Sequence, residues 1–372
     1  DMASMIHNEM RKHGIKLVLG YTVEGFKEKD NGVEVLLKDN PSLQADMVVL
    51  AIGVTPDTVL AKEAGLELGI KESIVVNDRM ETSVPDIYAA GDAVQVKHYV
   101  TGNDALISLA GPANKQGRII ADNICGGDSR YLGSQGSSVI KVFDMTAATT
   151  GINETNAKKS GLEVDTVILS PMSHAGYYPG GKVMTMKVVF EKETYRLLGA
   201  QIIGYEGVDK RIDVLATAIH AGLKATQLKD LDLAYAPPYS SAKDPVNMAG
   251  FMIDNIAKGT LKQWHLEDMD KISKDKNVVL LDVRTVGEFN RGYMKGFNNI
   301  PVDELRERIS EIEKGKPVYL ICQSGLRSYI ASRILEGNGY ETYNFSGGFR
   351  FYDTVVNDRA LIERAYACGM DY

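Results

Sequence analysis

The sequence predicts a multidomain protein built from α/β and α+β units. At 372 residues the chain is long enough for two or three domains that each bury a core. Two short apolar runs each lead through a turn into a helix-forming segment, which is typical of α/β units. Between these two places, several strand-forming runs precede one amphipathic helix, which is typical of an α+β unit.

The composition is that of an ordinary globular protein, with 44% hydrophobic and 24% charged residues. The net charge of -7 argues against nucleic acid as the main partner. No apolar run reaches the roughly 18–20 residues that cross a bilayer, and no signal peptide opens the chain. We therefore expect a cytoplasmic protein without a membrane partner.

The three cysteines, Cys125, Cys322 and Cys368, are too scattered for a zinc site or a disulfide framework. We expect no metal, and we expect any cysteine that matters to act as a thiol. Cys368 is predicted to be incidental, with a second thiol that resolves a persulfide as the alternative. The chain opens on a helix already in progress, without an initiator Met, so we expect it to be part of a longer protein.

Residues 1–14 are predicted to form a helix that ends at Gly14. Its apolar face comprises Met2, Met5, Ile6 and Met10. The β-rich runs that follow are Ile15–Leu19, Gly32–Leu37 and Asp46–Ala51. The last run leads into a turn that contains Gly53 and Pro56, which taken alone is a generic loop.

The segment Thr82–Asp92 combines a turn with a predicted strand, Ile87–Ala90, that ends at Gly91 and Asp92. Ligands of open parallel sheets gather at the carboxyl ends of strands. Gly91 lacks a side chain that would keep a ligand away, and Asp92 offers a carboxylate to sugar-like hydroxyls. The pattern therefore predicts a site for a polyol.

A helix is predicted within residues 105–126, with Pro112 at its first position and glycines after its end. Its positive amino end is expected to face a ligand. A helix that starts at a proline and merely packs is the alternative.

From residue 137 the pattern changes to strands and helices of an α+β unit. The predicted strands are Val139–Phe143, Thr166–Leu169, Val183–Phe190 and Leu198–Ile203, and the predicted helices are Glu154–Ser160 and Gly207–Ala221. Two loops rich in Pro and Gly, 174–180 and 233–240, carry tyrosines, and such loops present groups to ligands.

After a link at 257–263, Trp264 opens a third module. The strand Val278–Arg284 is followed by the strand Pro317–Ile321, which leads directly into residues 322–328 and the helix Tyr329–Glu336. Successive backbone N–H groups before a helix form an anion cradle. A thiol at its centre has a stabilised thiolate or persulfide and a lowered pKa, and Arg327 adds a fixed cation.

The segment Thr82–Asp92 resembles the second flavin-binding signature of the pyridine nucleotide-disulfide oxidoreductases. The resemblance implies that Asp92 holds the ribityl chain of FAD. By the same resemblance, Gly91, Ala110, Gly111 and Pro112 contact FAD, and Gly53 lies beside the nicotinamide of NAD(P)H.

The last module, about 105 residues, resembles a rhodanese domain. The resemblance lies in the Asp-Val-Arg strand, the Gly-x-x-x-Gly-x-x-x-Ile-Pro segment, the Cys-x-x-x-x-Arg loop and the later Ser-Gly-Gly. It implies that Cys322 carries sulfur. A Cys-to-Arg loop of six residues fits sulfur, whereas related phosphatases have one residue more.

Taken together, the modules resemble a coenzyme A-disulfide reductase fused to a rhodanese domain. This implies remnants of two Rossmann-like dinucleotide-binding domains at 1–56, for NAD(P)H, and at 57–135, for FAD. A homodimerisation domain at 136–256 and a rhodanese domain at 265–372 are expected to follow them. Tyr177 and Tyr235 are the implied catalytic donors beside Cys322 and Arg327. The implied substrate contacts are Lys243, Asn114, Gln323, Ser324, Gly325 and Leu326.

The implied activity is reduction of coenzyme A disulfide, persulfide or polysulfide by NAD(P)H and FAD, coupled to sulfane-sulfur transfer. The chain contains no G-x-G-x-x-G motif and no cysteine before Cys125. We therefore expect the reductase reaction to need further chain. The alternatives are a plain sulfurtransferase on a dimerisation scaffold and a flavin NADH oxidase or peroxidase.

Overall fold

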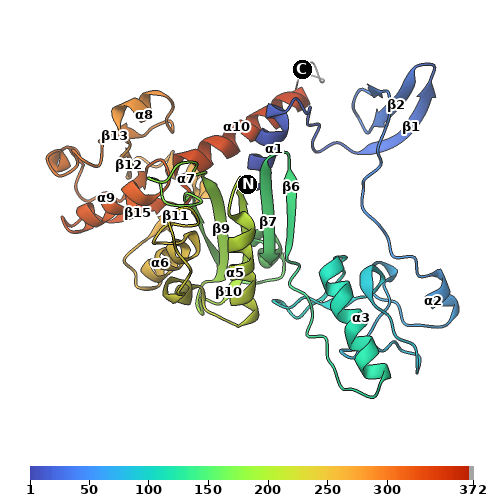
Figure 1. Cartoon of the computed structure of the whole chain (residues 1–372). Helices are drawn as coiled ribbons and strands as arrows, with labels where there is room; N and C mark the ends of the chain where they lie inside the picture. The colour runs from blue at the N-terminus through green and yellow to red at the C-terminus, as the bar shows by residue number, and fades with distance from the viewer. Residues whose placement is uncertain (368–372) are drawn as a thin grey trace. The chain divides into compact units, whose positions relative to one another are not determined.

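The computed structural model describes the backbone of residues 1–367 and the side chains of residues 1–363 (Figure 1). Cys368 lies outside the described residues. The chain divides into two compact units. The first comprises residues 1–9 and 137–356, and the second comprises residues 10–136 and the chain from 357. The predicted class of α/β and α+β domains is confirmed.

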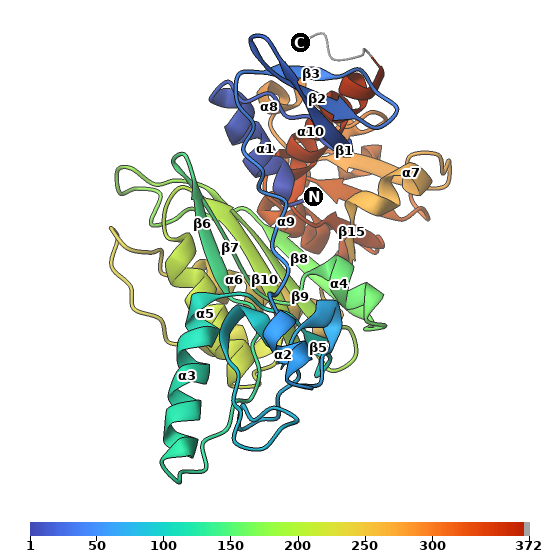
Figure 2. The ribbon, with the colours of Figure 1, turned by 90° about the vertical axis from the view of Figure 1, so that its right-hand side faces the viewer.

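One half of the first unit is an antiparallel sheet with strand order β6-β7-β10-β9-β8, and Figure 2 shows its strands side by side. The helix α5 packs on β10 and β7, and α4 packs on β8. The elements are β6 (Ser138–Val142), β7 (Met145–Gly151), α4 (Glu154–Lys159), β8 (Val164–Leu169), β9 (Met184–Glu191), β10 (Leu197–Gly204), α5 (Val208–His220) and α6 (Pro245–Ala257). Sequence reasoning missed only β7 among these strands, because its run of Ala and Thr lacks large apolar residues.

The other half of the first unit is a parallel sheet with strand order β11-β15-β14-β12-β13. Its strands are β11 (Gln263–Trp264), β12 (Val279–Asp282), β13 (Asn298–Asn299), β14 (Val318–Ile321) and β15 (Thr342–Phe345). The helices around it are α7 (Met269–Ile272), α8 (Val286–Asn290), α9 (Leu326–Glu336) and α10 (Gly348–Ala367). The two predicted strands are present, and α9 begins three residues earlier than predicted.

Several hydrogen bonds join these halves along the edge strand β8. The Ile168 N–H donates to Ser346 Oγ at 3.0 Å, and Gln263 Nε2 donates to the Thr166 carbonyl at 2.9 Å. An edge strand has unpaired backbone groups that must find partners. The parallel half supplies these partners, so the two halves form one compact unit.

The second unit contains the antiparallel sheet β1-β2-β3 and a mostly irregular segment that leads to a long helix. Its elements are β1 (Val23–Lys29), β2 (Gly32–Leu37), β3 (Leu43–Ala45), α2 (Val59–Glu63), η1 (Ile70–Glu72), η2 (Gly91–Ala93), β4 (Val96–Lys97), β5 (Asp104–Ala105) and α3 (Ala110–Ile124). The helix α1 (Ala3–Lys12) has the predicted position, and Gly14 follows it at a φ of 80°.

Three predicted strands of this unit are wrong. Ile15–Leu19 and Asp46–Ala51 belong to no ladder, and Ile87–Ala90 holds only one isolated bridge, from Tyr88 to Glu81. A strand forms only where a neighbouring strand receives its backbone hydrogen bonds. The apolar run at 46–54 has no such neighbour in the described chain, and Ile52 is 85% exposed.

The helix α3 begins at Ala110 and not at the predicted Pro112. Residues 110–112 nevertheless form its first turn, as the ligand-facing prediction requires. No helix within the described residues is long and apolar enough to cross a membrane. In the same part of the chain, His, Cys, Asp and Glu side chains form no group of three or more that could hold a metal ion.

Candidate functional site

Cys322 follows β14 directly and is fully buried. Its Sγ accepts hydrogen bonds from the Gly325 N–H at 3.1 Å and from Ser328 Oγ at 3.2 Å. Gly325 precedes α9 at a φ of 100°, a conformation that glycine adopts without strain. Donors that point at sulfur stabilise a thiolate or a persulfide anion more than the neutral thiol. The loop places one backbone N–H and one hydroxyl on the sulfur, and its role as an anion cradle stays a prediction.

The segment after β15 holds the loop in this shape. The Phe349 N–H donates to the Cys322 carbonyl at 2.8 Å, and the Arg350 N–H donates to the Gln323 carbonyl at 3.2 Å. At Gly348, with a φ of 71°, an added Cβ would lie 2.7 Å from the Gln323 carbonyl oxygen and from Ser324 Cα. Only glycine fits there, which explains the Ser-Gly-Gly sequence in structural terms.

Arg327 does not stand alone beside the thiol. Its two terminal nitrogens each donate to a carboxylate oxygen of Glu288 at 2.7 Å. These bonds lower the pKa of Glu288 to about 2 and raise the pKa of Arg327. Sequence reasoning missed Glu288. The only local signal is a capping box with Thr285, which marks the start of α8 and says nothing about Arg327.

Ser324 and Leu326 were predicted to contact substrate together with Gln323 and Gly325. The structure places Gln323, Ser324 and Gly325 in the loop after Cys322 and Leu326 at the start of α9. Leu326 is 65% exposed, so much of its apolar side chain faces solvent. Their role in substrate binding stays a prediction.

In the second unit, Gly91 and Asp92 lie at the amino end of α3. The Gly91 N–H donates to the buried Gln116 side chain at 2.7 Å, and a Cβ at Gly91 would lie 3.9 Å from Ala113 Cβ. No side chain caps α3 at Leu109. The first-turn N–H groups therefore remain available to a ligand, because an α-helix leaves its first four donors without intrahelical partners.

These residues fit the part of FAD that they are predicted to hold. A Cβ at Gly111 would meet nothing within 4 Å, so the space beside the first turn of α3 is open. Asp92 is exposed, and its carboxylate has no hydrogen bond or ion pair with the described chain. A helix amino end attracts negative charge, and a free carboxylate accepts bonds from hydroxyls.

The remaining predicted residues of this unit make no hydrogen bond or ion pair with Gly91 or Asp92 within the described chain. Gly53 has a φ of 93° in an exposed segment, with nothing within 4 Å of an added Cβ. Asn114 is exposed on α3, and its side chain donates to the Ala110 carbonyl at 3.0 Å. Both assignments stay predictions.

The structure brings the two candidate tyrosines together in the first unit. Their hydroxyl oxygens lie 2.8 Å apart, although 58 residues separate Tyr177 from Tyr235. Both side chains are exposed, and the hydrogen bond with Tyr177 raises the pKa of Tyr235. Lys243 is exposed in the loop that follows Tyr235, before α6.

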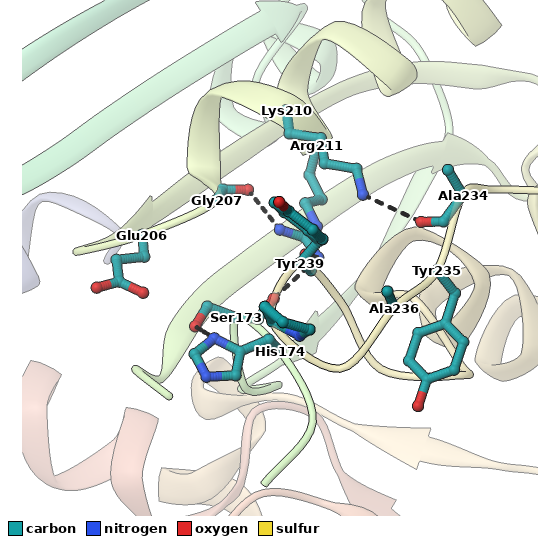
Figure 3. Close-up of a pocket in the computed structure, with 11 residues that line it drawn as sticks. Ser173, His174, Glu206, Gly207, Lys210, Arg211, Ala234, Tyr235, Ala236 and Tyr239 are labelled. Carbon is teal, nitrogen blue, oxygen red and sulfur yellow. Dashed lines mark hydrogen bonds between the residues drawn. The ribbon is translucent and has the colours of Figure 1, made fainter. Parts of the chain in front are cut away.

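A buried arginine that sequence reasoning missed ties the two tyrosine loops together. Arg211 is 1% exposed and donates to the Ser173 carbonyl at 2.9 Å and to Ser240 Oγ at 3.1 Å. Asp244 accepts from the same guanidinium at 3.0 Å and caps α6. Arg211 lines a cavity of about 550 Å³ together with Tyr235 and Tyr239. Figure 3 shows these three residues.

Profiles of known families match most of the chain. Residues 1–117 match the pyridine nucleotide-disulphide oxidoreductases, and residues 137–245 match the dimerisation domain of the same family. The chain belongs to this family. Residues 265–353 match the rhodanese-like domain, so the chain also carries a rhodanese module.

Individual relatives agree with these profiles. The NAD(P)H sulfur oxidoreductase (CoA-dependent) of Pyrococcus abyssi is 36% identical over 66% of this chain and 54% of its own length. The reduced CoADR-RHD of Bacillus anthracis has a TM-score of 0.93 at 46% identity, over 96% of this chain and 64% of that one. The NAD-dependent persulfide reductase of A. fulgidus has a TM-score of 0.86 at 40% identity, over 94% of this chain and 64% of that one. The chain thus spans between half and two thirds of the length of these relatives.

Proposed function

We propose that this oxidoreductase takes part in reduction of coenzyme A disulfide, persulfide or polysulfide by NAD(P)H and FAD. In this proposal Cys322 carries sulfane sulfur as a persulfide. The observation that carries it is the Cys322 cradle, where a buried sulfur accepts two hydrogen bonds, at 3.1 and 3.2 Å, from residues of its own loop and helix. Two of the relatives are named as a CoA-dependent NAD(P)H sulfur oxidoreductase and an NAD-dependent persulfide reductase. These names support the proposed function.

The proposed chemistry at Cys322 is a sulfur exchange. The thiolate attacks the outer sulfur of a donor R–S–SH, a new S–S bond forms on Cys322, and the donor's S–S bond breaks. The donor leaves as R–S⁻ with the electron pair of that bond and takes up the proton of the new Cys322 persulfide, which remains as an anion. The Gly325 N–H and the Ser328 hydroxyl stabilise the negative charge that Cys322 carries before and after the exchange.

The second unit is proposed to hold the flavin through Asp92 and the first turn of α3. When bound, FAD supplies two electrons from NAD(P)H for the cleavage of a sulfur–sulfur bond. Tyr177 and Tyr235 are proposed as proton donors to the sulfur that leaves, since each hydroxyl is exposed and holds the other in place. Lys243 is proposed to bind coenzyme A phosphates, and residues 136–256 are proposed to form a homodimer.

Replacing the thiol tests the sulfur half of this proposal. Cys322→Ala should lower the transfer of sulfur from thiosulfate to cyanide by at least about 1,000-fold, because the bond-forming atom is gone. Cys125→Ala is the matched control, since Cys125 is an exposed free thiol at the end of α3. Transfer that survives Cys322→Ala, or that is lost in Cys125→Ala, would contradict the assignment.

The flavin half is tested by FAD binding to the full-length protein that contains this chain. Asp92→Ala should weaken FAD binding at least about tenfold, measured by quenching of flavin fluorescence, because bonds from the carboxylate to hydroxyls are lost. Asp57→Ala removes another exposed carboxylate of the same unit and should leave FAD binding unchanged.

A plain sulfurtransferase is the second candidate, because the Cys322 cradle is built wholly from residues of this chain. NADH consumption separates the candidates. The lead proposal expects NADH loss with coenzyme A disulfide in the absence of oxygen. Sulfur transfer without such NADH loss would favour the plain sulfurtransferase, and NADH loss with oxygen alone would favour an NADH oxidase.

A further inference from the structure

Beside the Cys322 loop lies a second cavity of about 500 Å³, here called the arginine cavity. Its wall includes Gln323, the residue after Cys322, and Phe349, whose N–H donates to the Cys322 carbonyl. The cavity lies at the carboxyl ends of β12, β14 and β15, where parallel sheets bind ligands. Its volume is in the range of sites for small molecules. Arg284, Arg291 and Arg350 line it together with Glu288 and Asp353.

The buried member, Arg284, has donor capacity to spare. Its Nε and Nη2 bind Asp282 at 3.0 and 2.7 Å, and Nη2 also donates to the Gly292 carbonyl at 2.7 Å. The guanidinium also lies over the Phe349 ring, 3.8 Å from the ring centroid. Within the described residues its Nη1 has hydrogen bonds only at 3.5 Å, to the Glu288 carbonyl and to Gln323 Oε1. At that length a hydrogen bond is weak, so a buried donor remains poorly satisfied. An acceptor atom within the cavity would satisfy it.

The charges around the cavity favour an anion. Asp282 balances Arg284, and Arg327 balances Glu288 through two bonds of 2.7 Å. Arg291 and Arg350 are exposed, and neither side chain has a hydrogen bond or ion pair within the described residues. Asp353 opposes them with one negative charge, which leaves an excess of one positive charge.

We propose that the arginine cavity binds the anionic group of the small thiol or persulfide whose sulfur exchanges with Cys322. The proposal rests on the sulfur-transfer function given above. Arginine forks match carboxylates and phosphates alike, so the bound group is a carboxylate or a phosphate on a short thiol. Arg327 is less suited to this role because Glu288 already occupies its fork.

The proposed reaction beside this cavity transfers the outer sulfur of the Cys322 persulfide to an acceptor thiolate. An acceptor R–S⁻ held by its anionic group attacks the outer sulfur of the Cys322 persulfide. A bond forms between the two sulfurs, the S–S bond on Cys322 breaks, and its electron pair returns to Sγ. The acceptor leaves as a persulfide and Cys322 as a thiolate, without net oxidation.

The test uses the full chain with a Cys322 persulfide and three acceptors. These are 3-mercaptopropionate with a carboxylate, 2-mercaptoethyl phosphate, and neutral 2-mercaptoethanol. In the double variant Arg291→Gln and Arg350→Gln, we expect KM to rise about tenfold for an anionic acceptor, with kcat unchanged. KM for 2-mercaptoethanol should stay within about twofold of the original. The anionic acceptor with the larger loss identifies the bound group.

Arg306→Gln is the matched control, because this exposed arginine lines a different cavity of the same domain. It should change no KM. Equal changes for charged and neutral acceptors, or no change at all in the double variant, would overturn the proposal.

A binding measurement separates the cavity from the sulfur chemistry. In the Cys322→Ser chain, calorimetric titration with the two anionic thiols should give about tenfold weaker binding once both arginines are replaced. Unchanged binding contradicts the arginine cavity as an anion site. Failure of the unmodified chain to pass sulfur to 2-mercaptoethanol contradicts the sulfur-transfer function instead.

Discussion

The Cys322 loop and the turn at Gly91 each contain a glycine of positive φ but differ in how fully the described chain surrounds them. Each places a glycine of positive φ and an open backbone turn before a helix, α9 in one case and α3 in the other. Around Cys322, residues from β15, α9 and α10 supply bonds to the loop, and the sulfur is fully buried. At Gly91, the Gln116 side chain and the Ile74 N–H bind the turn, and Asp92 is exposed.

The comparison indicates that a local motif forms a fully enclosed site only when segments distant in the sequence pack against it. The parallel sheet brings Gly348 and Asn344 against the Cys322 loop, which fixes both its shape and its donors. The turn at Gly91 has no strand ladder beside it, because Ile87–Ala90 forms only one bridge. Its open side is where the proposal places FAD.

The largest expected effect is on the Cys322 loop. Gly348→Ala should lower the free energy of unfolding of the rhodanese module by about 3 kcal/mol, through positive φ and the clash at 2.7 Å with the Gln323 carbonyl. Trp264 is the single tryptophan, 2% exposed in the core of that module, so its fluorescence follows this unfolding. Denaturant titration followed at Trp264 gives the value.

Two other glycine-to-alanine variants serve as comparisons for Gly348→Ala. Gly339→Ala shares the positive φ in the same module but has open space around it, so it should cost about 1 kcal/mol. Gly91→Ala should cost about as much and leave the Trp264 transition unchanged, since its new Cβ meets only Ala113 at 3.9 Å. A Gly348 variant no less stable than the Gly339 variant would break the contrast.

A smaller effect is expected from the ion pair beside the thiol. Glu288→Gln should destabilise the rhodanese module by about 1–2 kcal/mol at pH 7, because the bidentate bond to Arg327 loses its charge. The pKa of Glu288 is lowered to about 2, so the pair contributes fully above about pH 4.5. Its contribution should decrease as the pH drops from about 4.5 towards 2. Near pH 2 the original chain and Glu288→Gln should have the same free energy of unfolding.

The measurement is again the Trp264 transition, now compared between the two proteins across that pH range. Glu304→Gln breaks a more exposed pair with Arg308 and should change stability by less than about 1 kcal/mol. A difference between the original chain and Glu288→Gln that stays constant from pH 7 to pH 2 would show that Arg327 does not hold the carboxylate.

The smallest expected effect concerns the tyrosine pair. Tyr177→Phe removes the hydroxyl that raises the pKa of Tyr235, so that pKa should fall towards its ordinary value near 10. NMR titration of the Tyr235 ring reports the change. Tyr239→Phe alters another exposed tyrosine in the same loop and should leave the Tyr235 titration as it was. An unaltered Tyr235 pKa in the Tyr177 variant would mean that the two hydroxyls do not meet.

Sequence patterns located the elements whose signal is local. The helices α4 and α5 and the strands β12 and β14 lie within about two residues of their predictions, because periodicity and capping act over short stretches. The same patterns failed at Ile15–Leu19 and Asp46–Ala51, where β-rich sequence is present but no neighbouring strand completes it. They also failed to single out Glu288 and Arg211, whose roles depend on partners far along the chain.

The sequence by itself determined the order of modules, the Cys322 loop between β14 and α9, and the helix whose first turn follows Gly91 and Asp92. The Cys322 loop depends on residues that follow one another directly between β14 and α9. The tertiary structure alone decided that Glu288 meets Arg327 across 39 residues and that Tyr177 meets Tyr235 across 58. Such pairs form only when packing of the core brings separate loops together, and no local pattern of residues encodes that distance.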